Sequence, residues 1–367
     1  MIYFVLILVI GSGFFFQLMG VIEVRGDSFE IVDCLPMFCL AIVFIFRMTY
    51  SVYNLPQIKI LLIKIQEYSL SAKSNEEHKI QNSHALFGRN FGYIYTYVIL
   101  GHNLLYTTAT LLTRFMHTQV EKNDTSSDEI ISAQIGISYR VNYFVDFDTY
   151  YVPIFIHTSL CTLCYIILIV TFDVLYITFV EHCRGLFATV RYRLESALLF
   201  ENDTYDSIKI STRDKSYSNV TYSIRRHTET LQFINIMNTV YSPPLFVQIG
   251  FSILILSVLG YQIITTANIN RFLKHAAYMN GLLINIFFEN WQGQRIIDSS
   301  EKVFASVCNI EWYNMPIAAR KLLRLIMMRS LRPMILTAGK FMILSYITFN
   351  AVIRTSSSYF MLLRNMT

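Results

Sequence analysis

The chain has 367 residues, of which 54% are hydrophobic and only 15% are charged, with a net charge of +5. A soluble globular protein carries about 25% charged residues, so this composition excludes an ordinary soluble domain. The apolar residues also cluster in long runs: residues 2–19 contain no charged side chain. We therefore interpret the chain as an integral membrane protein.

Seven apolar segments approach the length of about 20 residues that a helix needs to cross a bilayer core. They cover residues 2–21, 32–53, 91–112, 151–180, 236–264, 276–288 and 341–363. The alternative for the first segment is a cleaved signal peptide, but it lacks a preceding basic region and a clear cleavage site. The sequence predicts an all-α membrane protein with seven transmembrane helices.

The basic residues predict the orientation of these helices, because cytoplasmic loops are enriched in Lys and Arg. The loops after the second, fourth and sixth spans hold 21 of the 30 basic residues, and the loops after the first, third and fifth hold six. This split places the N-terminus in the cytoplasm and the C-terminus outside. The net positive charge follows from this topology and indicates no nucleic-acid partner.

The predicted outer loop, residues 113–150, carries six acidic residues and the sequon Asn123-Asp124-Thr125. A sequon on the outer side is an acceptor for N-glycosylation, so we expect a glycan on Asn123. The sequons at Asn202 and Asn219 lie in a predicted cytoplasmic loop and should remain unmodified.

Two cytoplasmic segments have an amphipathic helical pattern. Residues 55–69 place Ile58, Leu61, Leu62 and Ile65 on one stripe, and residues 309–334 separate a basic half from an apolar half. Such helices can lie on the inner leaflet. We favour the alternative, an anchor region within 181–235 and 289–340 that packs against neighbouring subunits, because helical patterns continue from the fourth, fifth and sixth spans.

No enzyme signature is present: the sequence lacks GxSxG, HExxH, Walker A and GxGxxG motifs. The pair Cys161 and Cys164 lies inside an apolar span without a second Cys or His pair at zinc spacing. We predict no catalytic activity, no metal site and no cofactor.

The last 80 residues resemble the C-terminus of insect odorant receptors. The matching elements are Gly293 before DSSEKVF, Trp312-Tyr313, the LTAGKF at 336–341, and Ser358-Tyr-Phe-Met-Leu-Leu. Residues 140–160 resemble the segment that leads into the fourth helix of that family, especially in its hymenopteran branch. The family's cytoplasmic N-terminal segment has no counterpart here, so we expect the sequence to be incomplete at that end.

Three alternatives are weighed beside this resemblance. Gustatory receptors end in Thr-Tyr, five apolar residues and Gln-Phe, whereas this chain has Ser358-Tyr359, four apolar residues, Arg364 and Asn365-Met366. A G-protein-coupled receptor would have the opposite topology. A secondary transporter should show inverted repeats and broken helices, for which only Pro243-Pro244 is suggestive.

The resemblance implies a subunit of a tetrameric, odorant-gated, non-selective cation channel. Such subunits lie in the plasma membrane of olfactory neuron dendrites, bind small volatile odorants and assemble with a common co-receptor subunit. Their partners would therefore be an odorant, the co-receptor, permeant cations and the lipid bilayer.

The family's last helix lines the pore, and the last span here has a matching polar arc. A helical wheel places Asn350, Arg354, Ser358 and Asn365 within one broad arc. Polar residues at membrane depth need water or a polar partner, so the alternative is a polar seam buried against other helices. Leu362 and Met366 border the arc and match the family's two apolar pore-narrowing positions, which makes them the predicted gate.

The resemblance also implies an odorant cavity among the outer halves of the second, third, fourth and sixth helices. Cavities for small ligands are mostly apolar with few polar anchors. The candidate residues are Met37, Phe38, Ala41, Tyr106, Thr107, Thr110, Ile154, His157, Thr158, Tyr278 and Met279. Each could instead serve helix packing, and we expect about half of them to contact the ligand.

Overall fold

The computed structural model describes residues 2–26, 28–71, 74–123, 136–199, 209–266 and 269–366. Its longer helices are α1 (Ile2–Glu23), α2 (Ser28–Tyr53), α3 (Leu55–Leu70), α4 (Asn75–Asn123), α5 (Tyr151–Leu199), α6 (Lys209–Thr265), α7 (Ile269–Asn309), α8 (Ile317–Ser330) and α9 (Tyr346–Met366). A 3-10 turn, η2 (Trp312–Asn314), precedes α8, and the short strands β1 (Thr337–Ala338) and β2 (Met342–Ile343) pair antiparallel before α9. The predicted all-α class is confirmed.

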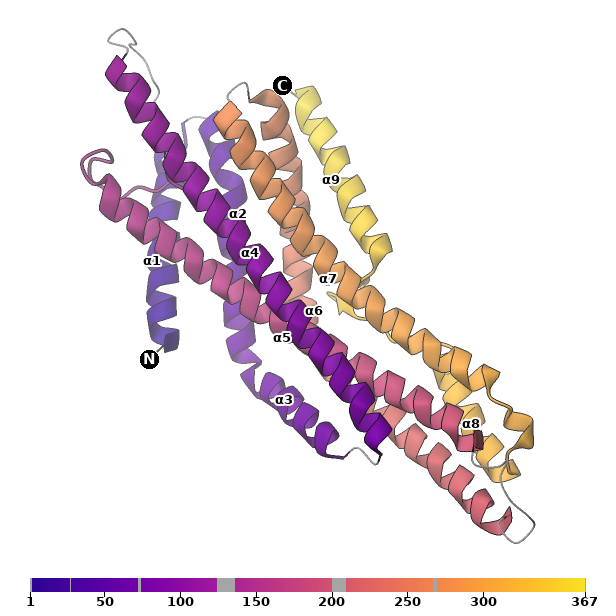
Figure 1. The fold of residues 1–367 in the computed structure, drawn as a ribbon. Helices are drawn as coiled ribbons and strands as arrows, with labels where there is room; N and C mark the ends of the chain where they lie inside the picture. Colours follow the sequence, from indigo (N-terminus) through magenta and orange to yellow (C-terminus); the bar gives the residue numbers. More distant parts are fainter. Residues whose placement is uncertain are drawn as a thin grey trace.

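Four helices are much longer than their predicted spans. Helices α4, α5, α6 and α7 have 49, 49, 57 and 41 residues, or about 60–85 Å at 1.5 Å per residue. Three of them, α5, α6 and α7, converge with α8 in a projection at the lower right of Figure 1. The expected continuation of the fourth, fifth and sixth apolar segments beyond their spans is confirmed.

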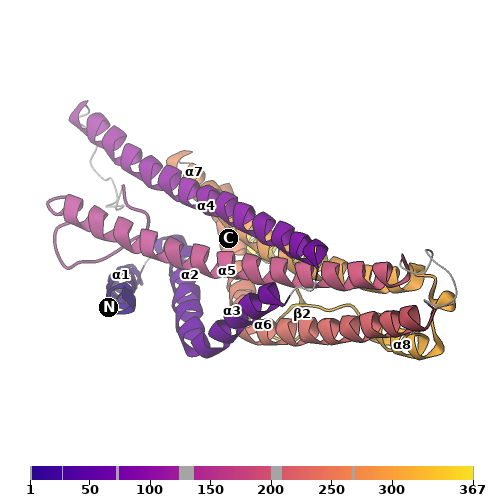
Figure 2. The ribbon, with the colours of Figure 1, turned by 60° about the horizontal axis from the view of Figure 1, so that its bottom comes forward.

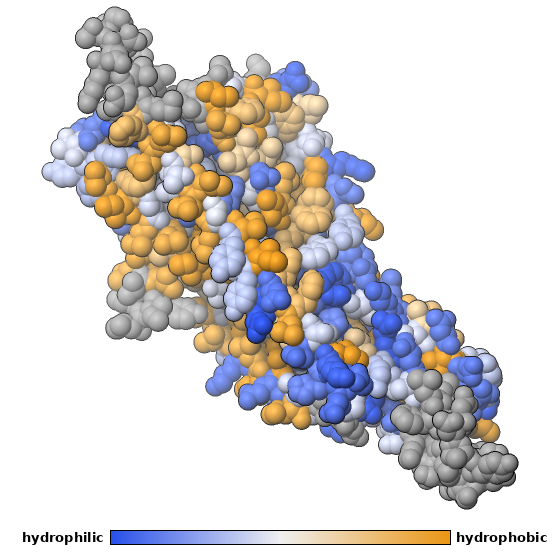
Figure 3. Space-filling view, in the orientation of Figure 1, coloured by the Kyte–Doolittle hydropathy of each residue, from blue (hydrophilic) through white to orange (hydrophobic). Residues whose placement is uncertain are grey.

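Hydropathy separates the projection from the rest of the molecule. Hydrophobic side chains dominate the upper left of the visible face, and hydrophilic ones gather toward the projection (Figure 3). Segments of α1, α2, α5 and α6 are long and apolar enough to cross a membrane by length and composition alone. The other predicted spans fall in α4, α7 and α9, whose polar residues lower their mean hydropathy.

Helix α5 lies at the centre of the fold. It contacts α1, α2, α4, α6 and α7, and Figure 2 shows it running between α4 and α6. The largest buried side chains of the core come from α5 and α6, among them Tyr176, Phe179, Phe187 and Phe233. Helices α2, α3 and α7 to α9 also contribute to this core, and α4 packs on α5 and α7, so the fold is one body from α2 to α9.

The predicted amphipathic segments form α3 and α8. In α3, Ile58 and Leu61 are buried, but Leu62 is 44% exposed, so the apolar stripe is narrower than expected. In α8, Leu323 and Ile326 are buried. Both helices therefore bury one face against the chain's own long helices, chiefly α6.

A buried ion cluster holds the base of the projection. The Glu181 carboxylate of α5 lies 2.5 Å from Arg295 Nη1 of α7 and 2.9 Å from Arg184 Nη1, and His84 of α4 approaches it at 3.2 Å. Burial lowers the pKa of Arg295 to about 10, although the Glu181 charge opposes this shift. The cluster joins α4, α5 and α7 at the boundary between the apolar region and the projection.

The start of α9 is fixed by a short hairpin. Residues 337–343 form β1, a turn with positive φ at Gly339 and Lys340, and β2, so the helix begins at Tyr346 rather than at residue 341. The Gly339 N–H donates to Ser242 O of α6, and the Ser345 N–H donates to Asn290 Oδ1 of α7. The hairpin thus ties the last helix to both α6 and α7.

Pro243 and Pro244 do not interrupt α6. Pro243 lacks the N–H that would bond to Thr239 O, and Tyr50 of α2 donates its hydroxyl hydrogen to that carbonyl instead. The continuous helix removes the one feature that suggested a transporter.

Candidate ligand cavity and the last helix

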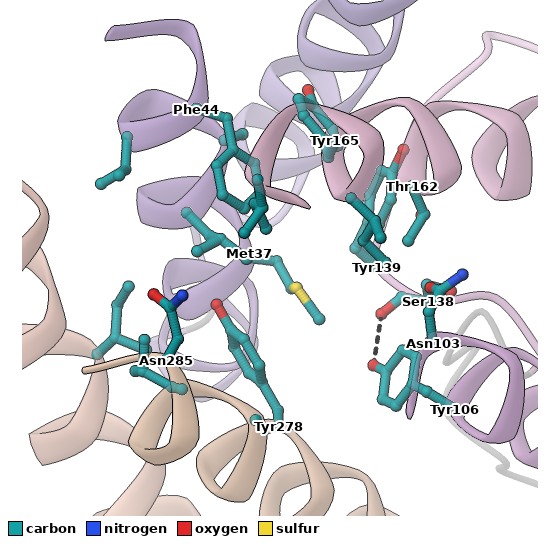
Figure 4. Close-up of a pocket in the computed structure, with 18 of the residues that line it drawn as sticks. Met37, Phe44, Asn103, Tyr106, Ser138, Tyr139, Thr162, Tyr165, Tyr278 and Asn285 are labelled. Carbon is teal, nitrogen blue, oxygen red and sulfur yellow. Dashed lines mark hydrogen bonds between the residues drawn. The ribbon is translucent and has the colours of Figure 1, made fainter. Parts of the chain in front are cut away.

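A cavity of about 170 Å³ lies where six helices meet (Figure 4). Its wall consists of Met37, Leu40, Ala41, Val43, Phe44 and Arg47 of α2; Ile99, His102, Asn103 and Tyr106 of α4; Thr162, Tyr165, Ile166 and Ile169 of α5; Gln248, Ser252 and Ile255 of α6; and Tyr278, Gly281, Leu282 and Asn285 of α7. Gln17 of α1 and the loop residues Ser138 and Tyr139 complete it.

The spacing of these residues shows that each helix contributes one of its faces to the cavity wall. The α7 positions 278, 281, 282 and 285 recur at three- and four-residue intervals, which is one face of an α-helix. Gly281 permits a close approach, because a Cβ there would lie 2.9 Å from His102 Nε2 of α4. The absence of a side chain therefore brings α4 and α7 together at the cavity.

Aromatic side chains frame the end of the cavity near Met37. The Tyr106 hydroxyl donates to Ser138 O at 3.1 Å, and the Tyr278 hydroxyl donates to Pro36 O at 3.1 Å. Figure 4 shows Tyr106 and Tyr139 across the cavity from Tyr278, with Met37 between them. Both phenol groups bond to backbone carbonyls, so their rings are held in place as apolar walls.

An ionic group closes the opposite end. Arg47 Nη2 of α2 lies 2.5 Å from Glu289 Oε1 of α7 and 3.6 Å from Asp173 Oδ1 of α5. The guanidinium also lies over the Phe172 ring at 4.2 Å. All three charged side chains are buried, so this end is polar and fixed.

Amide groups extend this ionic group toward α4 and α6. Asn285 Nδ2 lies 3.0 Å from Asp173 Oδ2, which also accepts a hydrogen bond from the Tyr95 hydroxyl. Gln248 Nε2 in turn donates to Asn285 Oδ1 at 2.5 Å. The resulting network, here called the polar network, consists of Arg47, Tyr95, Asp173, Gln248, Asn285 and Glu289 and connects five helices.

Four of the eleven predicted ligand residues line this cavity: Met37, Ala41, Tyr106 and Tyr278. The other seven line neither it nor a smaller cavity beside it: Phe38, Thr107, Thr110, Ile154, His157, Thr158 and Met279. Phe38 stacks on Phe14 of α1 with ring centroids 5.4 Å apart. One residue along a helix is a rotation of about 100°, which separates it from the cavity residue Met37.

Four other predicted residues have packing or intrahelical contacts. The hydroxyls of Thr110 and Thr158 donate to Thr107 O and Ile154 O of their own helices. Ile154 is buried in a cluster with Tyr139, and Met279 packs against the main core. These contacts support the packing alternative for these positions.

His157 fastens α1 to α5 rather than facing the cavity. Its Nε2 lies 3.1 Å from Ser12 Oγ of α1, and its Nδ1 is within hydrogen-bonding distance of the Tyr143 hydroxyl. Phe16 packs edge-on against the imidazole ring. Both ring nitrogens are engaged, so His157 has a structural environment.

Sequence reasoning missed the polar network. Arg47, Gln248 and Asn285 are not among the residues predicted from the sequence to form a site. Ionisable and amide side chains inside apolar spans generally mark functional positions. That signal alone would have identified the Arg47 end of the cavity.

Helix α9 has one packed face and one exposed face. Thr348, Val352 and Ser356 are buried, and Ser257 Oγ of α6 donates to Ser356 O at 3.1 Å. The predicted arc lies opposite: Asn350, Arg354, Ser358 and Asn365 are exposed, and Leu362 is 55% exposed. The side chain of Met366 lies outside the described residues. The chain therefore leaves the polar arc uncovered in its described part.

The predicted glycosylation site lies at the edge of the described chain. Asn123 is the last residue of α4, and its side chain and Thr125 are outside the described residues. Asn202 is also outside them, whereas Asn219 lies within α6 beside the buried Val220.

Comparison with known proteins identifies related sequences. The chain is 24% identical to putative odorant receptor 85d of Drosophila melanogaster over 144 residues and 27% identical to odorant receptor 67a of the same species over 143. Each alignment covers 39% of this chain and 35% of the relative. The odorant receptor coreceptor of Anopheles gambiae is 24% identical over 40% of this chain and 31% of its own length.

Comparison with solved structures identifies the same fold. The insect olfactory receptor OR5 from Machilis hrabei, solved in complex with eugenol, superimposes with a TM-score of 0.72 at 14% sequence identity. The match covers 98% of this chain and 88% of that one. At this identity the likeness concerns the fold alone.

A family model distinguishes between the odorant and gustatory receptor families that the sequence analysis compared. The model for the 7tm odorant receptor family matches residues 28–357, which include α2 to α8 and most of α9. The resemblance first noted in the C-terminal residues thus extends over nearly the whole chain, and it favours odorant over gustatory receptors. This chain belongs to the 7tm odorant receptor family.

Proposed function

We propose that this chain is the odorant-binding subunit of a ligand-gated, non-selective cation channel and that it works with a common co-receptor subunit. One observation carries the proposal: a single chain combines a mostly apolar cavity with a terminal helix whose polar face its described part does not cover. Family membership and the relatedness to a coreceptor add support. The site of action would be the plasma membrane of olfactory neuron dendrites.

The cavity suits a small volatile ligand. A dry protein cavity of about 150 Å³ is large enough to bind benzene, and this one measures about 170 Å³. Contacts of an apolar ligand with Leu40, Phe44 and Leu282 would be dominated by burial of apolar surface. Micromolar affinity, about −8 kcal/mol, is the scale expected for so small a ligand.

The pore would be formed by the exposed face of α9 from several subunits. Asn350, Ser358 and Asn365 would face water, and Leu362 with Met366 would form an apolar ring that closes by excluding water. Arg354 opposes cation flow if it faces the lumen, so we assign it to a subunit contact at the edge of the arc. The N-terminus would be cytoplasmic and the C-terminus outside, as the basic residues predict.

A ligand can open such a channel only by binding the open state more tightly than the closed state. The cavity wall offers a structural basis for this preference, because its α7 residues Tyr278 and Asn285 precede the contact between α7 and the start of α9 at Asn290. A shift of α7 on ligand binding would therefore reach the pore helix directly.

The test is expression of the chain with an insect co-receptor in cells, followed by whole-cell recording against a panel of volatile compounds. We expect a cation current that requires both subunits and does not require G-protein coupling. Cells that express the co-receptor alone are the control. Odorant responses that persist only through G-protein signalling would contradict the proposal.

The cavity assignment is tested in the same cells by two aromatic substitutions. Tyr106→Ala removes a cavity wall, so it should change the rank order of active odorants. Phe38 lies one position from the cavity residue Met37 but contacts α1. The Phe38→Ala variant should therefore preserve the rank order. Equal effects of the two variants at equal surface expression would argue that the cavity does not bind the odorant.

A further inference from the structure

Three side chains of the cavity wall leave hydrogen-bonding capacity unused: Tyr139, whose hydroxyl lacks a partner in the described structure, and Arg47 and Gln248 at the other end. Arg47 and Gln248 both line the cavity and are 5% and 4% exposed. Arg47 Nε and Gln248 Oε1 have no hydrogen-bond partner among the residues that the structure describes. An unpaired buried polar atom costs about 1–3 kcal/mol. One end of the cavity thus presents an unsatisfied donor and an unsatisfied acceptor.

Two carboxyl groups behind the cavity wall already compensate the positive charge of Arg47, with one carboxyl group in excess. Asp173 and Glu289 contact the Arg47 guanidinium but do not line the cavity. A bound anion would gain contact with Arg47 while being repelled by two nearby carboxyl groups. The Arg47 end therefore suits a neutral oxygen function better than a carboxylate.

The rest of the wall specifies what that oxygen is attached to. From Arg47 the α2 face continues through Phe44, Ala41 and Leu40 to Met37, a distance of about 15 Å at 1.5 Å per residue. Ile169 of α5 faces the same space. A ligand seated at the Arg47 end would accordingly project an apolar body along this wall.

We propose that the cavity selects odorants with one neutral oxygen function, a hydroxyl or a carbonyl, and seats that oxygen between Arg47 and Gln248. This inference rests on the proposed odorant-binding function and specifies its ligand class. A carbonyl oxygen accepts a hydrogen bond from Arg47. A hydroxyl oxygen does the same and also donates to Gln248 Oε1, so Gln248 distinguishes alcohols from ketones and aldehydes.

The experiment compares dose–response curves in cells that express the chain with a co-receptor. The probes are two matched series: toluene, benzyl alcohol, benzaldehyde and benzoate; and hexane, 1-hexanol, 2-hexanone and hexanoate. We expect the alcohol and the carbonyl compound of at least one series to act at concentrations about tenfold or more below those of the hydrocarbon and the carboxylate. This comparison needs no variant.

Gln248→Met then removes the acceptor while keeping the length of the side chain. The half-maximal concentration of the alcohol should rise about tenfold, the effect of losing one hydrogen bond, and that of the carbonyl compound should change less than about twofold. Met37→Leu, at the apolar end, is the matched control and should shift both probes alike.

Each outcome bears on a defined claim. Hydrocarbons as potent as their oxygenated counterparts, or an equal shift of alcohol and carbonyl compound in Gln248→Met, would overturn the inference and leave odorant gating intact. Absence of current with every probe, despite surface expression of the chain with its co-receptor, would count against the proposed function as well.

Discussion

Gly293 of α7 lies directly against Leu344, the residue that follows β2 before α9 begins. A Cβ added at Gly293 would lie 2.4 Å from both the Cβ and the carbonyl oxygen of Leu344. One turn earlier, Asn290 accepts the Ser345 N–H. These contacts make the beginning of α9 part of the same packed unit as α7.

The first prediction follows from this contact. Gly293→Ala should force α7 and the hairpin apart, because backbone at 2.4 Å cannot yield as a flexible side chain does, and overpacking costs about 1–3 kcal/mol. We expect a lower thermal midpoint for the detergent-solubilised receptor and a loss of odorant-evoked current. Gly250→Ala is the control, since a Cβ there meets nothing within 4 Å. Equal stability of both variants would mean that the contact is not tight.

The second prediction concerns the buried charges. Arg47→Met leaves Asp173 and Glu289 facing each other without a cation, and an uncompensated buried charge costs about 3–5 kcal/mol. Glu289→Gln instead leaves one carboxylate for one guanidinium. We expect Arg47→Met to abolish surface expression and Glu289→Gln to retain most of it, as measured by surface biotinylation. The reverse order would show that the ion pairs do not support the fold.

The third prediction concerns the proposed pore. Leu362→Ser should wet the apolar ring and raise the current without odorant, whereas Asn365→Ala should change single-channel conductance or ion preference. Ser356→Ala alters the buried face of α9 and should leave conductance unchanged. Single-channel recordings in which neither Leu362→Ser nor Asn365→Ala differs from wild type would mean that α9 does not line the pore.

The fourth prediction tests the orientation. A glycosidase should lower the apparent mass of the wild-type chain, and Asn123→Gln should abolish that shift. Asn219→Gln serves as the control and should leave the shift in place, because its sequon lies in the predicted cytoplasmic part of α6. A glycan on Asn219 would place that part of the chain outside and overturn the predicted topology.

The helices were predictable because each leaves a local signal in the sequence. The apolar run from Tyr151 predicts the start of α5 at the observed residue, and the wheel of the last span separates the exposed Arg354 from the buried Val352. Side-chain periodicity alone carries this information. The predicted start of α9 was less accurate, because Phe341 and the apolar residues after it are equally compatible with a helix and with a hairpin.

The cavity was harder to predict because it depends on how helices rotate against one another. Met37 lines it and Phe38 does not, although both are apolar neighbours at the same level of α2. The packing of α2 against α1, α5 and α6 decides which of the two lines the cavity, and it places Phe38 against Phe14 of α1. Sequence periodicity gives no information on that rotation.

The uncovered face of α9 has a consequence for how cells handle this protein. A copy that reaches the bilayer alone would present Asn350, Arg354 and Ser358 to acyl chains, and an arginine there costs about 3 kcal/mol even on lenient scales. This cost favours copies whose α9 face is covered by another subunit over copies that stand alone. If the chain assembles as proposed, the scarcer subunit limits the number of receptors at the cell surface, and synthesis of this chain beyond the amount of its partner would not raise that number.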